Sequence, residues 1–318
     1  MSERNYKYDV TVIGAAIADV LAHPVDAAAL NVPSYPAEGI TLGIGGDAAN
    51  EARALAGLGK KVSLVTKFGD DMLGDMLKGH FERLGVSTEY STTQSGIDTG
   101  INIVLVAPDG GRSFITNSNG TLRLLGADDI PDAALDAAPI VSFASIFVSP
   151  LLDIPAMSTL FSKIKACGCT LCADMTRCRH GETAEDLRPV LKYVDYLFPN
   201  QDEAAAVTGQ KLPSEAAAVL LECGASCVVI KTGGAGCHIK SRDLELDIPA
   251  YPHSRCIDTT GAGDNFAAGF IYALSKGMEP AYCARFANAA ASIAIESVGA
   301  FSPDVTRENV LERMKEIM

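Results

Sequence analysis

Apolar residues along this chain follow two spacings that alternate with each other. Short runs rich in Val, Ile and Phe are typical of buried strands, whereas apolar residues at every third or fourth position are typical of amphipathic helices. The predicted strands lie at 8–14, 61–69, 139–147, 169–175, 196–200 and 227–234. Helical patterns lie at 48–59 and 70–85 and between the later strands. The alternation predicts an α/β fold with a mostly parallel sheet that is covered on both faces.

The segment 70–85 illustrates the helical pattern. It begins with Asp and ends at Gly85, and both residues are typical of helix ends. Its apolar stripe comprises Met72, Leu73, Met76, Leu77, Phe81 and Leu84.

Two regions interrupt the alternation. Residues 98–120 predict a β-hairpin, because two β-prone runs flank a Pro-Asp-Gly-Gly turn at 108–111. Residues 20–44 are rich in loop-forming residues, including three prolines, and end in a short apolar run. We expect the two regions to join as a small sheet beside the main domain, where it can serve as a lid or a dimer surface.

Composition and charge narrow the function. The 318 residues suit one large α/β domain, and 26 basic against 39 acidic residues give a net charge of −13. Such an acidic chain disfavours nucleic-acid binding. The longest uncharged run, 137–152, is shorter than the ~20 residues of a membrane span, and prolines interrupt it. The polar start, MSERNYKYD, lacks the apolar core of a signal peptide, so we expect a cytoplasmic protein.

Four of the nine cysteines cluster in the sequence, at Cys167, Cys169, Cys172 and Cys178. The spacing of Cys169 and Cys172 is that of a zinc or iron–sulfur ligand pair. The alternative is that these thiols pack in the core. On a strand the two side chains would point to opposite faces, and the chain lacks a second such pair. The pattern therefore favours core packing, and the role of the cluster stays open.

The first glycine-rich motif is GIGGDAAN at 43–50. Gly43, Gly45 and Ala48 match the spacing of a dinucleotide-binding fingerprint, which makes an NAD-dependent dehydrogenase one alternative. The fingerprint normally follows the first strand of its domain directly. Here that predicted strand ends at Gly14, about thirty residues earlier, so the dehydrogenase is the less favoured interpretation.

The second motif is DTTGAGDNFAAGF at 258–270. Gly261, Ala262 and Gly263 precede a predicted helix, and small residues there let backbone N–H groups approach an anion. Asp264 can be a helix cap, or it can be the base that takes a proton from an attacking hydroxyl. The positive end of the helix also predicts that Asp264 is ionised. An anion site beside a carboxylate suits phosphoryl transfer, and the Walker A pattern is absent.

This motif closely resembles the C-terminal signature of the PfkB, or ribokinase-like, carbohydrate kinases. Residues 45–74 resemble the N-terminal signature, and 14–19, 199–204, 229–237, 287–294 and 297–302 add shorter matches in the family's order. The resemblance implies a Rossmann-like three-layer α/β fold with a small β-sheet lid. It implies a single kinase domain, 1–318, in which the lid segments are approximately 15–44 and 98–120, and a homodimer formed through the lid.

The resemblance also implies roles for individual residues. Asp264 would be the catalytic base beside an anion hole made by Gly261, Ala262 and Gly263. The expected acceptor-binding residues are Asp19, Gly45, Gly46 and Asn50. The expected ATP- and Mg²⁺-binding residues are Asn200 and Glu203 near the phosphates, Lys231, Gly233 and Gly236 facing the nucleotide, and Asn288 near its base or ribose. A potassium site in some members corresponds to Asp258, Thr260, Gly299 and Ser302.

The implied function is an ATP- and Mg²⁺-dependent kinase that phosphorylates a primary hydroxyl of a small sugar or sugar acid, of the ribose, fructose or 2-keto-3-deoxygluconate type. A nucleoside kinase of the same fold is the alternative, although the chain has no Trp and few aromatic residues in the predicted lid to stack on a base. Val148 stands where ribokinases carry an acidic residue. Arg112, Arg177 and Arg179 either face an acidic substrate group or are surface charges, and we favour the surface.

Overall fold

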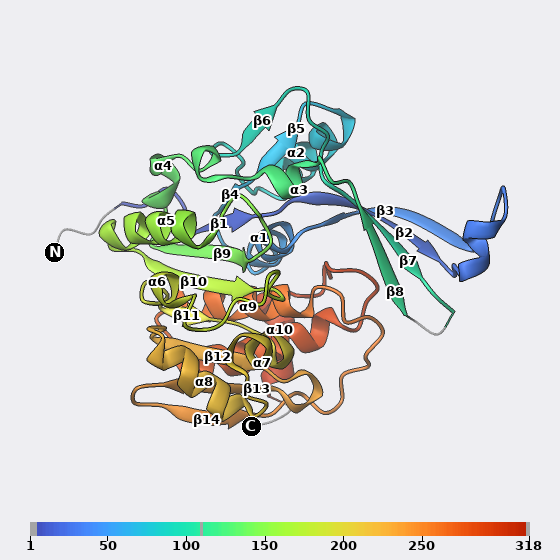
Figure 1. Ribbon diagram of the computed structural model, residues 1–318. Helices are drawn as coiled ribbons and strands as arrows, with labels where there is room; N and C mark the ends of the chain where they lie inside the picture. Colours follow the sequence, from blue (N-terminus) through green and yellow to red (C-terminus); the bar gives the residue numbers. More distant parts are fainter. Residues whose placement is uncertain (1–4, 109–110, 316–318) are drawn as a thin grey trace.

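The central feature of the computed structural model, which describes residues 5–108 and 111–315, is a large sheet. Within these residues, eight strands form it in the order β14-β13-β12-β11-β10-β9-β1-β4 (Figure 1). Six neighbouring strands pair in parallel, in the order β4, β1, β9, β10, β11 and β12. Strands β13 and β14 add to the β12 edge in antiparallel orientation. The strands are β1 (Val10–Gly14), β4 (Val62–Val65), β9 (Ile140–Ile146), β10 (Thr170–Met175), β11 (Tyr196–Leu197), β12 (Cys227–Lys231), β13 (Cys237–Ser241) and β14 (Glu245–Ile248). The predicted mostly parallel sheet is confirmed.

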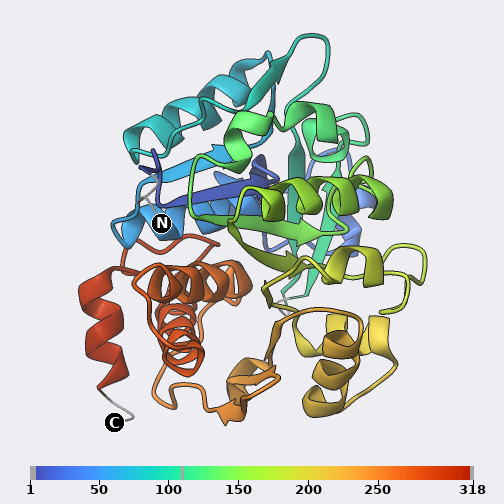
Figure 2. The same cartoon turned by 90° about the vertical axis from the view of Figure 1, so that its left-hand side faces the viewer.

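Helices cover both faces of the sheet, as the view in Figure 2 shows. One face packs against α1 (Asp47–Gly57), α2 (Met72–Arg83), α9 (Ala262–Leu274), α10 (Pro280–Ala294) and α11 (Arg307–Met314). The other packs against α4 (Asp132–Leu135), α5 (Ile154–Ala166), α6 (Arg188–Leu191), α7 (Gln201–Thr208) and α8 (Pro213–Glu222). Val12 and Ile13 of β1 are both fully buried, one in each core, which gives the strand its continuous apolar run.

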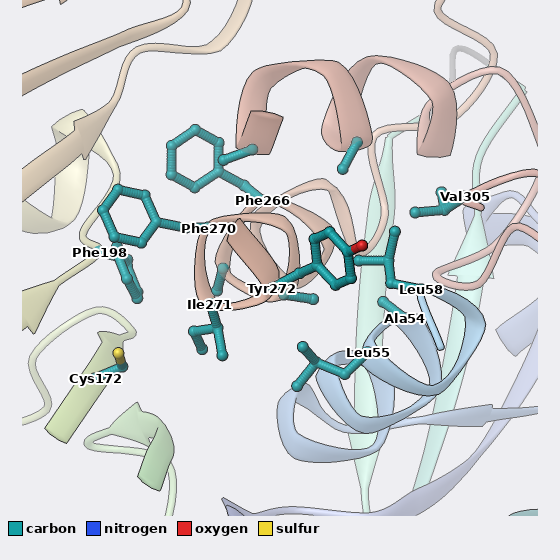
Figure 3. Close-up of a cluster of buried hydrophobic side chains, with 14 of the residues drawn as sticks. Ala54, Leu55, Leu58, Cys172, Phe198, Phe266, Phe270, Ile271, Tyr272 and Val305 are labelled. Carbon is teal, nitrogen blue, oxygen red and sulfur yellow. The ribbon is translucent and has the colours of Figure 1, made fainter. Parts of the chain in front are cut away.

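Helix α9 is held by aromatic contacts in one of these cores (Figure 3). The ring of Phe270 lies 5.0 Å from that of Phe198 and 5.2 Å from that of Tyr196, measured between centroids. Gly269 lets α10 approach closely, since a Cβ there would lie 2.9 Å from the Cβ of Ala290. The position of the N-terminus of α9 is therefore fixed by well-packed, non-local contacts.

A separate small sheet projects from the domain (Figure 1). In the part of the chain that the structure describes, its four strands run in the order β3-β2-β7-β8, with β2 and β7 parallel. They are β2 (Ile17–His23), β3 (Gly39–Gly45), β7 (Ile101–Val106) and β8 (Arg112–Thr116). The 3₁₀ turn η1 (Ala27–Asn31) connects β2 and β3. The two regions that interrupt the sequence pattern thus do form one sheet, while Asp109 and Gly110 of the predicted turn lie outside the described residues.

The remaining elements are short. Strands β5 (Lys67–Gly69) and β6 (Thr92–Gln94) pair with each other, and α3 (Thr121–Leu124), η2 (Ala127–Asp129) and η3 (Gly233–Ala235) complete the chain. The strand predicted at 61–69 is divided at Thr66, because β5 leaves the central sheet to pair with β6. Strand β11 is shorter than predicted, because Asn200 already caps α7.

Two other sequence predictions have clear outcomes. In α2, Leu77 and Phe81 are buried as the stripe suggests, but Met72 at the first helical position is 86% exposed. Cys169 and Cys172 lie in opposite cores, as the packing interpretation expects. The described residues contain no group of three His, Cys, Asp or Glu side chains arranged to hold a metal ion.

Among the described residues, we find no helix with the length and apolar character that crossing a bilayer requires.

Candidate active site

A cavity of about 450 Å³ opens at the carboxyl ends of the central parallel strands. This is the edge at which α/β sheets generally bind ligands. The cavity is lined by Asp19, Gly46, Asp47, Asn50, Asn102, Ser145, Asp174, Met175, Thr176, Asn200, Glu203, Lys231, Gly233, Thr260, Gly261, Ala262, Gly263, Asp264 and Ala300. Most of the predicted site residues therefore meet here, although the sequence separates them widely.

Gly261 begins the N-terminal turn of α9 at the wall of this cavity. Its φ of +72° is left-handed, and a Cβ on it would lie 2.5 Å from the carbonyl oxygen of Ala300. The first-turn N–H groups that follow have no intrahelical acceptor and carry the positive end of the helix dipole. Ala262, Gly263 and Asp264 all line the cavity at this turn. The turn thus has the geometry of an anion site.

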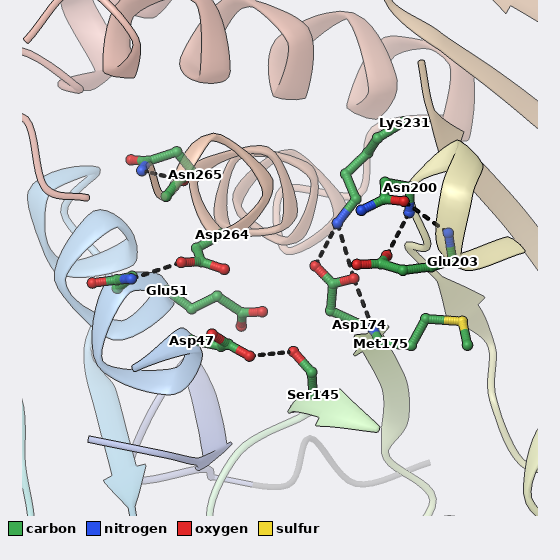
Figure 4. A network of polar contacts seen from close by, with 12 residues as sticks. Asp47, Glu51, Ser145, Asp174, Met175, Asn200, Glu203, Lys231, Asp264 and Asn265 are labelled. Atoms are coloured by element: carbon green, nitrogen blue, oxygen red, sulfur yellow. Dashed lines mark hydrogen bonds and ion pairs between the residues drawn. The ribbon is translucent and has the colours of Figure 1, made fainter. Parts of the chain in front are cut away.

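Asp264 is aimed across the cavity at α1 (Figure 4). Its Oδ2 accepts a hydrogen bond of 2.7 Å from Nδ2 of Asn50, and α9 has no side-chain cap. Burial and the nearby charge of Asp47 raise the pKa of Asp264 to about 8, against the lowering effects of Asn50 and Lys231. The prediction that the helix end keeps Asp264 ionised is therefore wrong, because desolvation outweighs the dipole. A carboxyl with this pKa is well matched to general-base work near neutral pH.

Asn50 is itself oriented by Arg53, one turn later on α1. The guanidinium of Arg53 donates to Oδ1 of Asn50 at 2.5 Å and to the carbonyl oxygen of Ile44 at 2.9 Å. With its oxygen bound to Arg53, the amide of Asn50 must present its nitrogen to Asp264. Asn50 and Arg53 are 6% and 5% exposed, so the pair is rigidly held.

Asp19 from β2, a predicted acceptor-binding residue, lines the cavity, and we call its side of the cavity the acceptor end. Gly45 lies behind it, and a Cβ there would come within 2.0 Å of Oδ2 of Asp19, so a larger residue would displace the carboxylate. Gly46, the residue before α1, also lines the cavity. Burial raises the pKa of Asp19, and a hydrogen bond from Asn102 opposes the shift. Asp19 and Asn102 are register partners on neighbouring strands, which places them on one face of the small sheet.

Lys231 lies at the end of β12, beside the N-terminal turn of α9. Its ammonium donates to both carboxylate oxygens of Asp174, at 2.6 and 2.9 Å (Figure 4). Asn200 and Glu203 form a reciprocal cap at the start of α7. Burial, with the charge of Asp174, raises the pKa of Glu203 to about 7. These groups form the second end of the cavity, which is the end predicted to hold phosphates.

A second cavity of about 460 Å³ adjoins the first at Lys231, Gly233, Ala262 and Gly263. Gly236 and Asn288 line it, together with apolar groups such as Tyr251 and Phe266. Asn288 also has a structural role, because its Nδ2 donates to the carbonyl oxygens of Ile248 and Pro249 at 3.2 Å each. Two cavities that meet at one helix N-terminus can hold two reactants on either side of a transferred anion.

Three of the four predicted potassium residues, Asp258, Thr260 and Gly299, lie together before α9. Asp258 accepts hydrogen bonds from the N–H and hydroxyl of Thr260, at 2.9 and 2.7 Å, and from the N–H of Gly299 at 2.9 Å. Ser302, the fourth residue, is buried, and its hydroxyl accepts a hydrogen bond from the N–H of Asp304. These contacts order the loop, and the potassium role stays a prediction.

Four carboxyl and amide groups of the site were missed by the sequence reasoning. Asp47 accepts a hydrogen bond of 2.8 Å from the hydroxyl of Ser145, and burial raises the pKa of Asp47. Glu51, one turn later on α1, accepts a hydrogen bond of 2.6 Å from the hydroxyl of Ser142. The sequence did contain signals for three of them. Asp174 lies at the end of a predicted strand, where α/β sheets bind ligands. Asp47 and Glu51 are four positions apart beside a glycine motif, so both can face the same side of a helix. Asn102 is brought in by strand pairing alone.

Two alternative interpretations are not supported by this geometry. Gly43 and Gly45 lie in β3, which pairs antiparallel with β2 in the small sheet, and not in the turn after β1. The dinucleotide fingerprint is therefore absent in three dimensions. Arg177 is exposed, Arg179 donates to the carbonyl oxygen of Val148, and neither lines the cavity. The side chain of Arg112 lies outside the described residues.

Comparison with known proteins identifies the family. The model of the pfkB family carbohydrate kinases matches residues 7–307. The chain belongs to the pfkB family of carbohydrate kinases. It is 31% identical to a ribokinase of Bacillus subtilis over 84% of this chain and 86% of that protein. It is 28% identical to a ribokinase of Haemophilus influenzae over 95% of this chain and 97% of that protein. The pfkB chain is accordingly a sugar kinase, a phosphotransferase that acts on an alcohol group.

Solved structures share the fold of this pfkB chain. A ribokinase from Thermotoga maritima superposes with a TM-score of 0.81 at 25% identity, covering 97% of this chain and 99% of the other. A ribokinase from Arabidopsis thaliana, solved with ribose and ATP, gives 0.80 at 24% identity over 97% and 99%. An E. coli protein solved with ATP and Mg²⁺ gives 0.80 at 22% identity over 97% and 98%. The ribokinase-like fold implied by the sequence is confirmed.

Proposed function

We propose that this sugar kinase transfers the γ-phosphoryl group of ATP to a primary hydroxyl of a small sugar or sugar acid, of the ribose, fructose or 2-keto-3-deoxygluconate type. The observation that carries the proposal is the position of Asp264. Its carboxyl lies at the N-terminus of α9, where the two cavities meet. ATP as the donor agrees with the ATP complexes of the Arabidopsis and E. coli proteins.

In this proposal Asp264 accepts the proton of the acceptor hydroxyl as its oxygen attacks the phosphoryl group. Asn50 holds the carboxyl in place, with its own orientation set by Arg53. The N–H groups of Gly261 and Gly263 stabilise the negative charge on the transferred group, because they are fixed before the reaction begins. The N–H of Ala262, the third predicted donor, already donates to the carbonyl oxygen of Thr259 at 3.2 Å. Lys231 offers a positive charge beside the same turn, since a Cβ on Gly263 would lie 3.2 Å from its ammonium.

The site fits Mg²⁺ bound jointly with the phosphates. Glu203 and Asp174 are carboxylates close enough for the charge of one to raise the pKa of the other, and a divalent cation relieves that repulsion. Mg²⁺ normally takes one or two protein carboxylates and completes its shell with phosphates and water, so a dedicated cage is not needed. Glu203 and Asn200 would hold it, and it would neutralise charge on the β- and γ-phosphates. Potassium would bind by Asp258, Thr260, Gly299 and Ser302.

The small sheet is proposed to act as lid and dimer surface. Its strand register places Asp19 and Asn102 on one face with Phe114, and puts Leu42, Ile103 and Ile115 on the other. Leu42 and Ile115 are 54% and 52% exposed, and Ile40, on the same side, is 70% exposed. An exposed apolar face on a sheet is costly in water, and a second copy of the chain would cover it.

The cavity favours a sugar over a nucleoside as acceptor. None of the described residues that line the first cavity is aromatic, so a nucleobase would find no ring to stack on there. A coupled ADP-release screen over sugars, sugar acids and nucleosides, with and without K⁺, tests the proposal. ADP release that depends on a sugar and is lost in Asp264→Asn supports it. Release that depends on nucleosides alone would contradict the choice of acceptor.

A further inference from the structure

Three carboxyl groups line the first cavity, those of Asp19, Asp47 and Asp264, from β2, α1 and α9. Two oxygens here are buried and lack a hydrogen-bond partner among the described residues, Oδ1 of Asp19 and Oδ1 of Asn102. Ser145 donates to Oδ2 of Asp47 and leaves that carboxylate otherwise available to a ligand. A ligand must supply hydrogen-bond donors to satisfy these acceptors.

The positive charges nearby are already engaged. Lys231 is the one Lys or Arg among the described residues that line this cavity, and both oxygens of Asp174 bind its ammonium. Arg53 lies behind Asn50 and donates to Oδ1 of Asn50 and to Ile44. Its guanidinium also stacks on Phe301, 4.8 Å from the ring centroid. Among the described side chains, a carboxylate on the acceptor would therefore find no uncommitted cation at this end of the cavity.

Charge and hydrogen bonding thus act in the same direction. A hydroxyl or an ammonium group donates hydrogen bonds to the unpaired oxygens, whereas a carboxylate can only accept and would face like charges at short range. A repulsive element of this kind is a common basis of specificity.

We propose that Asp47, together with Asp19, excludes anionic acceptors, so that the substrate is a neutral or amine-bearing polyol and not a sugar acid. Asp47 is the specificity-determining residue, because it lies at the start of α1 between Asp19 and Asp264 and influences the charge of both. This inference rests on the proposed kinase function and narrows its choice of substrates.

The test compares acceptors that differ in charge alone. D-fructose, 2-keto-D-gluconate and 1-amino-1-deoxy-D-fructose share one configuration and differ at C1, and they join a wider panel of neutral sugars, amino sugars and aldonic acids. For each acceptor, kcat/KM and the inhibition constant against the best acceptor are measured for the wild type, Asp47→Asn and Asp75→Asn. Asp75 is the matched control, since its side chain is 78% exposed on α2 and pairs with Lys78.

We expect the wild type to prefer neutral or amine-bearing acceptors over the matched acids by about 30-fold or more, mainly through KM. Asp47→Asn should reduce that preference about tenfold, and Asp75→Asn should leave it unchanged. A sugar acid as the best wild-type acceptor, or an unchanged preference in Asp47→Asn, would overturn the inference while leaving the kinase function intact. A failure to release ADP with any acceptor would instead contradict the kinase function itself.

Discussion

Nδ2 of Asn50 donates to Oδ2 of Asp264 at 2.7 Å, although 214 positions separate the two residues in the sequence. The bond joins the first turns of α1 and α9, and Arg53 fixes the amide that makes it. A carboxyl held in this way, beside a helix N-terminus and among other carboxylates, has both a defined direction and a raised pKa.

Asp264→Asn should abolish most of the activity and yet stabilise the protein in alkaline solution. Removal of a general base typically lowers kcat by about 10²–10⁴-fold. The native pKa of about 8 exceeds the ordinary value of 3.8, so the folded protein binds more protons than the unfolded chain between those pH values. The stability of the wild type therefore falls as pH rises from about 4 to 8, and a variant with Asn at this position should not show this fall.

Thermal unfolding of both proteins at pH 6 and pH 9 tests this pH dependence. A variant that is destabilised equally at both pH values would contradict the raised pKa.

The pH profile of kcat/KM should show the same group. Activity requires the ionised base, so kcat/KM should rise with pH and level off above about 8. The hydrogen bond from Asn50 lowers the pKa of Asp264, so Asn50→Ala should move the rising limb to higher pH. A limb that stays near pH 4 in the wild type would show that Asp264 is not the titrating base.

Lys231→Met should weaken both ATP binding and the fold. The substitution leaves Asp174, which is 4% exposed, without its partner. Loss of one member of a buried ion pair costs about 3–5 kcal/mol. The double variant with Asp174→Asn should recover most of that stability but not the KM for ATP. Denaturant unfolding and ATP titration separate the two effects, and full recovery of the KM would assign Lys231 a structural role alone.

Gly261→Ala should impair catalysis far more than the equivalent change at Gly277. Both glycines have left-handed φ values, +72° and +73°, and so carry a similar backbone cost for alanine. A Cβ at Gly261 meets Ala300 at 2.5 Å, whereas at Gly277 it meets nothing within 4 Å. We expect a loss of about 10²-fold in kcat for the first, because the anion site shifts, and little change for the second. Steady-state kinetics at matched protein stability provide the measurement.

The apolar face of the small sheet should control the oligomeric state. We expect the wild type to be a dimer and the double variant Leu42→Ser, Ile115→Ser to be a monomer, by analytical ultracentrifugation. Met72→Ser is the control, since Met72 is 86% exposed but lies on α2. A wild-type monomer, or a double variant that remains dimeric, would contradict the proposed interface.

Local sequence patterns predicted much of this molecule. The strand and helix order followed from apolar spacing, because burial on both faces of a parallel sheet demands continuous apolar strands. The glycine motif predicted the start of α9 and the place of Asp264 in its first turn, because a left-handed residue such as Gly261 and a helix start are encoded within a few positions. The break in the alternation at 20–44 and 98–120 predicted the small sheet, and the family resemblance supplied most of the residues that line the cavity.

Other properties depend on residues that only the fold brings together. The ion pair of Lys231 with Asp174, the position of Asp47 and the contact of Asn102 with Asp19 link segments far apart in the chain. The pKa of Asp264 was mispredicted from the helix end, because the sequence shows the dipole but not the burial and the neighbouring carboxylates that oppose it. The sequence by itself determined which groups could do the chemistry. The tertiary structure decided their charge states and partners, because desolvation and Coulomb interactions depend on distances that local spacing does not encode.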